Sequence, residues 1–306
     1  GSLDRRDDRL SQVSEESSMR GSGPMANDSW RGPVSRPPGL GGVFQYRDSL
    51  RASGSGRGTG NSDILGRLNI AEPTPEQQMA DQLFDQAADY WSKGNLIQAE
   101  DLFNQALRED PNHVPSLCSL GVYLYDVKHD HEKAEKLYKR ALHLDPQNVN
   151  TLCNYGWLLH DVRRDHDGAE KLYKQALKID PDHIMTLCNY GALLHEYLHD
   201  VRGDLNDVEK MYKKALRLDP YHIDTLNNYG LLLHKTKRDI GGAEEMYRRV
   251  LALDPNQVDT LCSYAMLLKE DKNDPAHAKM LVQRAQRLDR SHPWIQANQA
   301  NYLNFI

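Results

Sequence analysis

The sequence predicts an all-α fold in which helix pairs stack into a solenoid, and a repeat is the main evidence for it. A short motif recurs five times between residues 117 and 264 of the 306-residue chain, and its second residue is, in order, Cys118, Cys153, Cys188, Asn227 and Cys262. These positions are 35, 35, 39 and 35 residues apart. A period of this size is typical of stacked supersecondary units, each of which packs only against its neighbours.

The spacing of apolar residues within one unit indicates two helices. In residues 149–181, apolar side chains recur at helical spacing over 152–159 and again over 169–179, with a polar break between them. The second pattern ends at Asp180-Pro181, because proline lacks the amide that a helix needs and its ring clashes with the preceding turn. Each unit is therefore predicted to be an antiparallel pair, a helix A followed by a helix B.

Polar residues at fixed positions mark where the helices begin. Thr74-Pro75-Glu76-Gln77 forms a capping-box pattern with proline at the first helical position, so we place the start of the repeats there. A short side chain with a hydrogen-bond acceptor also lies four residues before the small residue of every helix B. These predicted caps are Asn95, Asp130, Asp165, Asp204, Asp239 and Asp274.

The complete motif resembles the tetratricopeptide repeat (TPR). Leu-x-x-(Leu/Tyr)-Gly in helix A is followed by Ala-x-x-x-Tyr-x-x-Ala in helix B and then by Asp-Pro. The resemblance implies a right-handed α-solenoid of six helix pairs over residues 73–290, followed by a capping helix at 291–306. The six units are expected at about 76–112, 113–147, 148–182, 183–221, 222–256 and 257–290. Extra residues at 196–199 predict a longer helix A in the fourth unit.

Residues 1–72 differ in composition from the repeats. They are dominated by Gly, Ser, Arg and Pro and contain no Lys. Such a segment cannot bury enough apolar surface to offset its chain entropy, so we expect a disordered tail. Its net charge is about +1 and that of the whole chain is −6, so the repeats carry about −7. An acidic domain is a poor partner for nucleic acid.

The sequence contains no apolar run of membrane-spanning length and no signal peptide ahead of the repeats. Its four cysteines recur at one position of the repeat, which is not the pattern of a secreted disulfide framework. We therefore expect an intracellular, cytoplasmic protein.

A row of asparagines is the main candidate for function. The resemblance implies that the A helices line a concave groove, and the sixth repeat position there is Ser119, Asn154, Asn189, Asn228 and Ser263. We name Asn154, Asn189 and Asn228 the Asn row; it resembles the asparagine ladder of the O-linked N-acetylglucosamine transferase solenoid. An asparagine offers one acceptor and two N–H donors, so it can pair with the backbone of an extended peptide. The alternative is a polar residue merely tolerated on a solvated helix face.

Two further features flank the Asn row. His160, His195 and His234 share the twelfth position, where they serve either as pH-dependent contacts or as polar residues bonded to the adjacent turn. Trp157, at the ninth position, is predicted to be an exposed aromatic anchor. The cysteine row lies about one helix spacing apart from unit to unit, too far for a disulfide or for a shared zinc ion. We expect small, partly buried groove residues there, and neither a metal nor a cofactor.

These features favour a non-catalytic protein-interaction scaffold that binds an extended peptide in its groove. Because acidic residues such as Asp224 and Asp259 are present, the expected partner segment is neutral to basic. The chain's own tail and a second copy of the chain are further candidate partners. Two alternatives remain: an RNA-binding helical repeat, and the regulatory or substrate-recruiting arm of an enzyme whose catalytic domain lies elsewhere.

Overall fold

The computed structural model describes residues 73–201 and 205–303. Within these ranges every regular element is a helix, as the sequence predicts. None of these helices has the combination of length and apolar character that crossing a membrane requires. The predictions for the tail at 1–72 and for the cap Asp204 fall outside the described residues.

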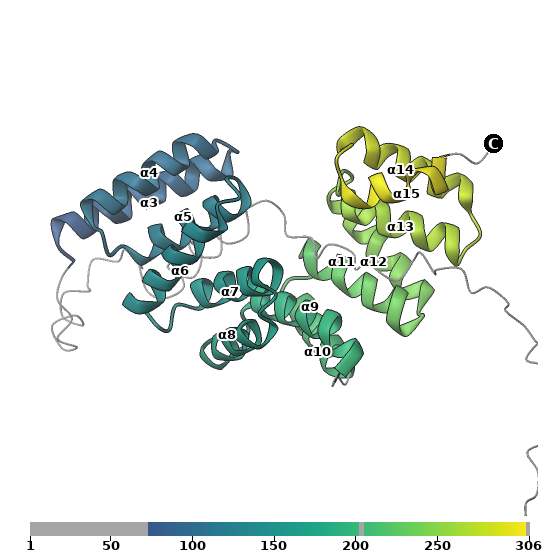
Figure 1. The fold of residues 1–306 in the computed structure, drawn as a ribbon, viewed down its shortest axis with the longest axis horizontal. Helices are drawn as coiled ribbons and strands as arrows, with labels where there is room; N and C mark the ends of the chain where they lie inside the picture. Colours follow the sequence, from purple (N-terminus) through teal and green to yellow (C-terminus); the bar gives the residue numbers. More distant parts are fainter. Residues whose placement is uncertain (1–72, 202–204, 304–306) are drawn as a thin grey trace, which may run out of the picture. The chain divides into compact units, whose positions relative to one another are not determined.

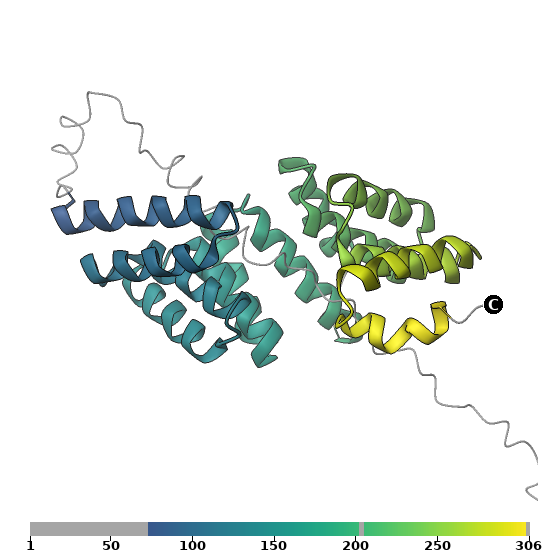
Figure 2. The ribbon, with the colours of Figure 1, turned by 90° about the horizontal axis from the view of Figure 1, so that it is seen from above.

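The helices pair in chain order, and each pair packs on the next (Figures 1 and 2). The pairs are α3 (Pro75–Ser92) with α4 (Leu96–Glu109), α5 (Val114–Asp126) with α6 (His131–Leu144), α7 (Val149–Leu158) with α8 (His166–Ile179), α9 (Ile184–Val201) with α10 (Leu205–Leu218), α11 (Ile223–Leu231) with α12 (Ile240–Leu253), and α13 (Val258–Glu270) with α14 (Pro275–Leu288). A last helix, α15 (Pro293–Leu303), packs on α14. Six helix pairs and a terminal helix are thus confirmed.

The predicted side-chain caps are formed at the described helix starts, with one exception. The Thr74 hydroxyl accepts a hydrogen bond from the Gln77 amide and the Gln77 side chain accepts one from the Thr74 amide, which completes the capping box. At helix B, a carboxylate accepts from the amide three residues later in four units, at Asp130, Asp165, Asp239 and Asp274. Asn95 makes no such bond, so the prediction was wrong there.

The turn between the two helices of a pair uses one residue in the left-handed region of backbone space. These residues are Gly94, His129, Arg164, Arg238 and Asn273, with φ between 51° and 75°. Glycine adopts this conformation without steric cost, whereas a side chain is strained there. In the third and fifth pairs, helix A enters the turn through π-helical segments, η1 (Leu159–Arg163) and η2 (Leu232–Lys237).

The A helix of the fourth pair is longer than those of the second and sixth pairs. α9 has 18 residues, whereas α5 and α13 have 13 each. The extra length includes Glu196 and Tyr197, as the insertion predicts. The Tyr197 ring lies against the His166 ring of the preceding pair, with the ring centroids 5.0 Å apart.

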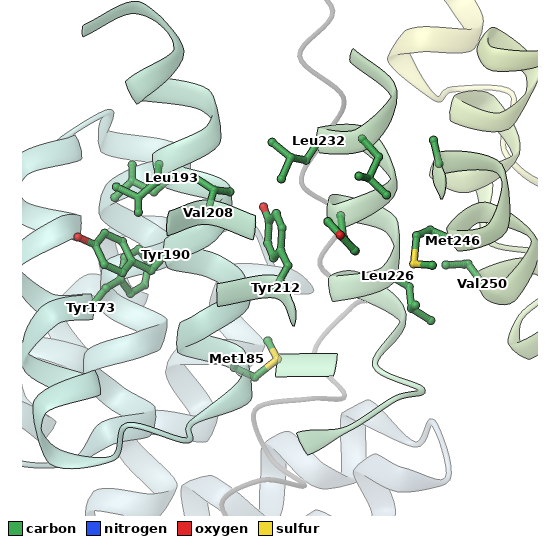
Figure 3. Packing of buried hydrophobic residues seen from close by; sticks show 14 of the residues in the cluster. Tyr173, Met185, Tyr190, Leu193, Val208, Tyr212, Leu226, Leu232, Met246 and Val250 are labelled. Carbon is green, nitrogen blue, oxygen red and sulfur yellow. The ribbon is translucent and has the colours of Figure 1, made fainter. Parts of the chain in front are cut away.

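A tyrosine of helix B fills the space beside a glycine of helix A in the same pair. A Cβ added to Gly121, Gly156, Gly191 or Gly230 would lie 2.6–2.7 Å from a ring carbon of Tyr138, Tyr173, Tyr212 or Tyr247. These four tyrosines are fully buried. Figure 3 shows Tyr173 and Tyr212 among the buried side chains of the central cluster, together with Tyr190 and Leu193 of α9. The glycines are therefore required for close helix approach.

Candidate functional site

The Asn row lies on α7, α9 and α11, one residue per pair, and its side chains are buried. Only 5%, 4% and 3% of Asn154, Asn189 and Asn228 are exposed. Each side-chain amide donates to a cysteine sulfur one repeat earlier. The Nδ2–Sγ distances are 3.4 Å for Asn154–Cys118, 3.5 Å for Asn189–Cys153 and 3.5 Å for Asn228–Cys188. The sequence offered no packing reason for these asparagines, and this contact supplies one.

The asparagine and the cysteine are also replaced together. Where Asn227 stands in place of the cysteine, the next repeat has Ser263 in place of the asparagine. There the Asn227 oxygen instead accepts from the Thr260 hydroxyl at 2.9 Å. Ser119 and Ser263, at the two ends of the predicted row, are buried as well.

The sulfur contact fixes the orientation of each amide without occupying all of its hydrogen-bonding capacity. It involves one of the two N–H donors, and a thiol is a weak acceptor. Two of the thiols are held in the protonated, unreactive form, because burial raises the pKa of Cys188 to about 12 and that of Cys262 well above its usual range. All four cysteines are free and buried.

Trp157 is not the exposed anchor that the sequence predicts. Only 5% of it is exposed, and its indole Nε1 donates to the Tyr125 hydroxyl at 2.8 Å. The Tyr125 hydroxyl in turn donates to the Asp161 carboxylate at the end of the next A helix. Trp157 therefore joins neighbouring pairs instead of presenting a free aromatic face.

The histidine row connects each repeat to the next. Nε2 of His160 lies 2.9 Å from Glu196, and Nε2 of His234 lies 2.8 Å from Asp271. His195 bonds to the Thr236 hydroxyl at 2.8 Å. Each of these partners belongs to the following unit. His160 and His234 are buried, and burial lowers the pKa of His234.

A second set of inter-repeat contacts was missed from the sequence. A glutamate of helix B accepts from a tyrosine of the next helix A in four pairs: Glu135–Tyr155, Glu170–Tyr190, Glu209–Tyr229 and Glu244–Tyr264. Three of the same glutamates also pair with a cation of the next turn: Arg163, Lys237 and Lys272. The constant Glu–Tyr spacing of 20 residues was the available signal.

The Asp-Pro turns are held from the following helix B. A long side chain donates to the proline carbonyl, or in the last case to Asn256: Arg140 to Pro111, Gln175 to Pro146, Lys214 to Pro181, Arg249 to Pro220 and Arg284 to the Asn256 side chain. These residues recur at the repeat period because each binds the turn before it.

Among the described residues, one group could offer three ligand atoms to a metal ion. Atoms of His234, Glu270 and Asp271 lie within 4.8 Å of one another. Lys235 already pairs with Glu270 at 3.1 Å, and Arg238 lies 3.9 Å from Asp271. Both carboxylates are thus already engaged, by these cations and by the His234–Asp271 hydrogen bond.

The expected preference for a basic ligand rested on Asp224 and Asp259, and Asp81 lies at the same repeat position. Asp81 bonds to His113 at 3.0 Å and Asp259 bonds to His292 at 2.9 Å. Asp224 is buried. These aspartates therefore attract a basic ligand less strongly than their presence in the sequence indicates.

Comparison with known proteins agrees with this architecture. Tetratricopeptide repeat family models match residues 84–149 and 137–171, and a model described as TmcB, TPR repeats, matches residues 237–293. The sequence matches none of the curated proteins.

Similar solved structures include PilF of Pseudomonas aeruginosa, at 21% identity over 74% of this chain and 100% of that one, with a TM-score of 0.56. PilW, a type IV pilus biogenesis factor, has 18% identity over 72% of this chain and 99% of its own, with a TM-score of 0.57. The Cut9–Hcn1 hetero-tetramer of the APC/C has 15% identity over 86% of this chain but 47% of its own, with a TM-score of 0.63. These likenesses show the fold alone. The stacked helix pairs and the repeat matches show that the chain contains tetratricopeptide repeats.

Proposed function

We propose that this protein is a non-catalytic interaction scaffold that holds an extended segment of a partner protein along the A-helix face carrying the Asn row. The repeat family supports a protein-interaction scaffold in general. The peptide ligand and its place on the A helices are our own inference. The intracellular, cytoplasmic location likewise remains a prediction from the sequence.

One observation carries the proposal. Three amides on successive A helices are held by the same sulfur contact, so they share one orientation relative to their helices. Helices pack 8–10 Å apart, and an extended chain advances about 3.3 Å per residue. Successive amides would then meet every third residue of a peptide and would recognise its backbone whatever its side chains.

The chemistry of the row favours a ligand recognised mainly through neutral backbone groups. Amides can pair with both the N–H and the C=O of a peptide. The carboxylates of Asp81 and Asp259 are engaged by histidines. A neutral to basic segment therefore remains the expected partner, with backbone recognition contributing more than charge.

The experiment that tests the proposal compares two triple variants of the full chain in affinity capture. Asn154/Asn189/Asn228→Ala removes the amides, whereas Cys118/Cys153/Cys188→Ala removes the sulfur contacts and leaves the amides in place. We expect the asparagine variant to lose its partners and the cysteine variant, whose amides are present but no longer held by sulfur, to retain them with weaker affinity, with both variants folded by circular dichroism. Equal retention of all partners by both variants would show that binding occurs on another surface.

A further inference from the structure

Three successive B helices, α6, α8 and α10 (Figure 1), carry basic side chains at three shared positions. Within each helix these positions are spaced i, i+3 and i+7, so the three side chains lie along one face. All nine side chains are exposed. We name this set the basic block, and it consists of Lys136, Lys139 and His143 on α6, Lys171, Lys174 and Lys178 on α8, and Lys210, Lys213 and Arg217 on α10.

The basic block is confined to the second, third and fourth pairs. The first of its three positions is Asp101 in α4, Glu245 in α12 and Met280 in α14. A position that stacking requires keeps its residue type along the array, as the buried tyrosine of helix B does from α6 to α12. The helix dipole favours a cation in the last turn, which covers only the third position of each helix. Neither stacking nor the dipole therefore accounts for the block.

Four cations of the block form no ion pair with any described residue. The middle lysine of each helix pairs with the glutamate four residues earlier, at 2.7 Å on α6, 2.9 Å on α8 and 2.7 Å on α10. Lys210 pairs with Asp207 at 2.8 Å. The four cations without such a partner in the described ranges are Lys136, Lys171, Lys178 and Arg217. Their charges face solvent and are available to an anion.

Two of the middle lysines can turn to a ligand at little cost. The Glu135 carboxylate also pairs with Arg163 at 2.7 Å, and the Glu209 carboxylate also pairs with Lys237. Both glutamates accept a tyrosine hydroxyl as well. These carboxylates therefore keep partners when Lys139 or Lys213 moves away, and an exposed ion pair contributes little to stability.

The surroundings of the block favour carboxylates over the other polyanions. α6, α8 and α10 contain one tyrosine each and no Phe or Trp, and these tyrosines are fully buried, so none of these helices offers a base a ring to stack on. The repeats carry about −7 overall, which opposes a long nucleic acid. All but one of the permanent cations are lysines, which attract carboxylates as point charges and lack the bidentate fork with which arginine recognises phosphate.

We propose that the basic block is a second docking surface of this protein and that it binds an acidic segment, rich in Asp and Glu, of a partner protein. The surface lies on the B helices and is separate from the A-helix face that carries the Asn row. The seven residues from the first to the third position of each helix rise about 10 Å, which about three residues of an extended chain cover. An acidic segment of about twelve residues is thus long enough to meet cations of more than one helix.

Fluorescence anisotropy of the full chain at low salt, with a labelled peptide of about twelve residues that alternates Glu and Ser, tests the proposal. The lysine variant, Lys136/Lys171/Lys178→Ala, removes three charges without breaking an ion pair. The matched control, Arg108/Arg287/Arg290→Ala, removes the same charge from exposed positions outside the block. We expect the lysine variant to bind the peptide roughly tenfold more weakly than wild type, and the control to change by less than about twofold. A peptide with Gln in place of Glu should not bind.

Other ligands and the other face are distinguished in the same assay. Labelled single-stranded DNA of similar length and vesicles containing phosphatidylserine should bind more weakly than the Glu peptide. Tighter binding of either one, lost in the lysine variant, would overturn the proposal, as would equal losses of the peptide by the two variants or no binding to wild type. The variant Asn154/Asn189/Asn228→Ala should retain the peptide. Its loss there would place the peptide on the A-helix face and would also overturn the proposal.

Discussion

The side-chain amide of Asn189 donates to the sulfur of Cys153, 3.5 Å away and one repeat earlier in the chain. If this contact stabilises the junction between α7 and α9, the two side chains must be coupled energetically. We expect Asn189→Ala and Cys153→Ala to destabilise the fold individually and to show a coupling free energy of about 0.5–1 kcal/mol in a double-mutant cycle. Urea unfolding of the four proteins gives this value. A coupling of zero would mean that the amide and the sulfur are merely neighbours.

Gly191→Ala is expected to destabilise the protein by about 1–3 kcal/mol, because the new methyl group would lie 2.7 Å from Cε1 of the fully buried Tyr212. The fall in the thermal unfolding midpoint measures the effect. Gly241→Ala is the matched control, since only a single atom lies near that position, at 3.9 Å. Similar destabilisation by both variants would contradict a steric origin.

Arg164→Gly is expected to stabilise the protein by roughly 0.5–1 kcal/mol. Arg164 has φ of 55°, a strained value for a side chain, and Gly94 occupies the equivalent position in the first pair. The neighbouring Arg163→Gly is the control. It should instead destabilise, because two nitrogens of the Arg163 guanidinium donate to the Glu135 carboxylate at 2.9 and 2.7 Å. Chemical unfolding of both variants measures whether each substitution raises or lowers the free energy of unfolding.

Asp165→Ala should cost about 1 kcal/mol of stability, because the Asp165 carboxylate accepts from the Gly168 amide at 2.9 Å and caps α8. Asn95→Ala, at the equivalent position before α4, should cost much less, since Asn95 makes no side-chain cap bond. Equal losses in the urea midpoint would indicate that the side chain acts through turn propensity and not through capping.

The pH dependence of stability should include a contribution from Glu209. Hydrogen bonds from Lys213 and Lys237 lower the pKa of Glu209 to about 2, against 4.5 in the unfolded chain. Because the folded pKa is the lower one, the stabilisation is present above pH 4.5 and is lost as the pH falls towards 2. Glu209→Gln should therefore be less stable than wild type at pH 6, with a difference that shrinks at pH 2.5. Glu245→Gln, at an exposed position on α12, is the control variant.

The local features of the fold could be predicted from the sequence, because local spacing determines them. The capping box at Thr74, the four aspartate caps and the longer α9 follow from residues close to one another in the chain. The left-handed backbone of Arg164 could not be predicted, since arginine has no preference for that region. The two helices that flank Arg164, η1 and α8, require the left-handed conformation at this position, which Gly94 occupies in the first pair.

The candidate site was predicted less well, because its contacts join residues about one repeat apart. Asn189 looked like a free polar residue until its sulfur partner Cys153 was known. Trp157 is buried and donates a hydrogen bond to Tyr125, 32 residues earlier. No local pattern in the sequence indicates this contact. Side chains that serve the stacking of repeats and side chains that serve a ligand have the same periodicity, so periodicity alone cannot separate them.

The bonds between glutamates and tyrosines, and those that hold the Asp-Pro turns, connect each pair only to the next one. Tension applied to the two ends of such an array passes through every junction in turn, as it does through springs joined end to end. The softest junction then takes up most of the extension, and the remaining repeats stay intact. Under load the array would lengthen stepwise, one repeat at a time, and would not fail as a whole.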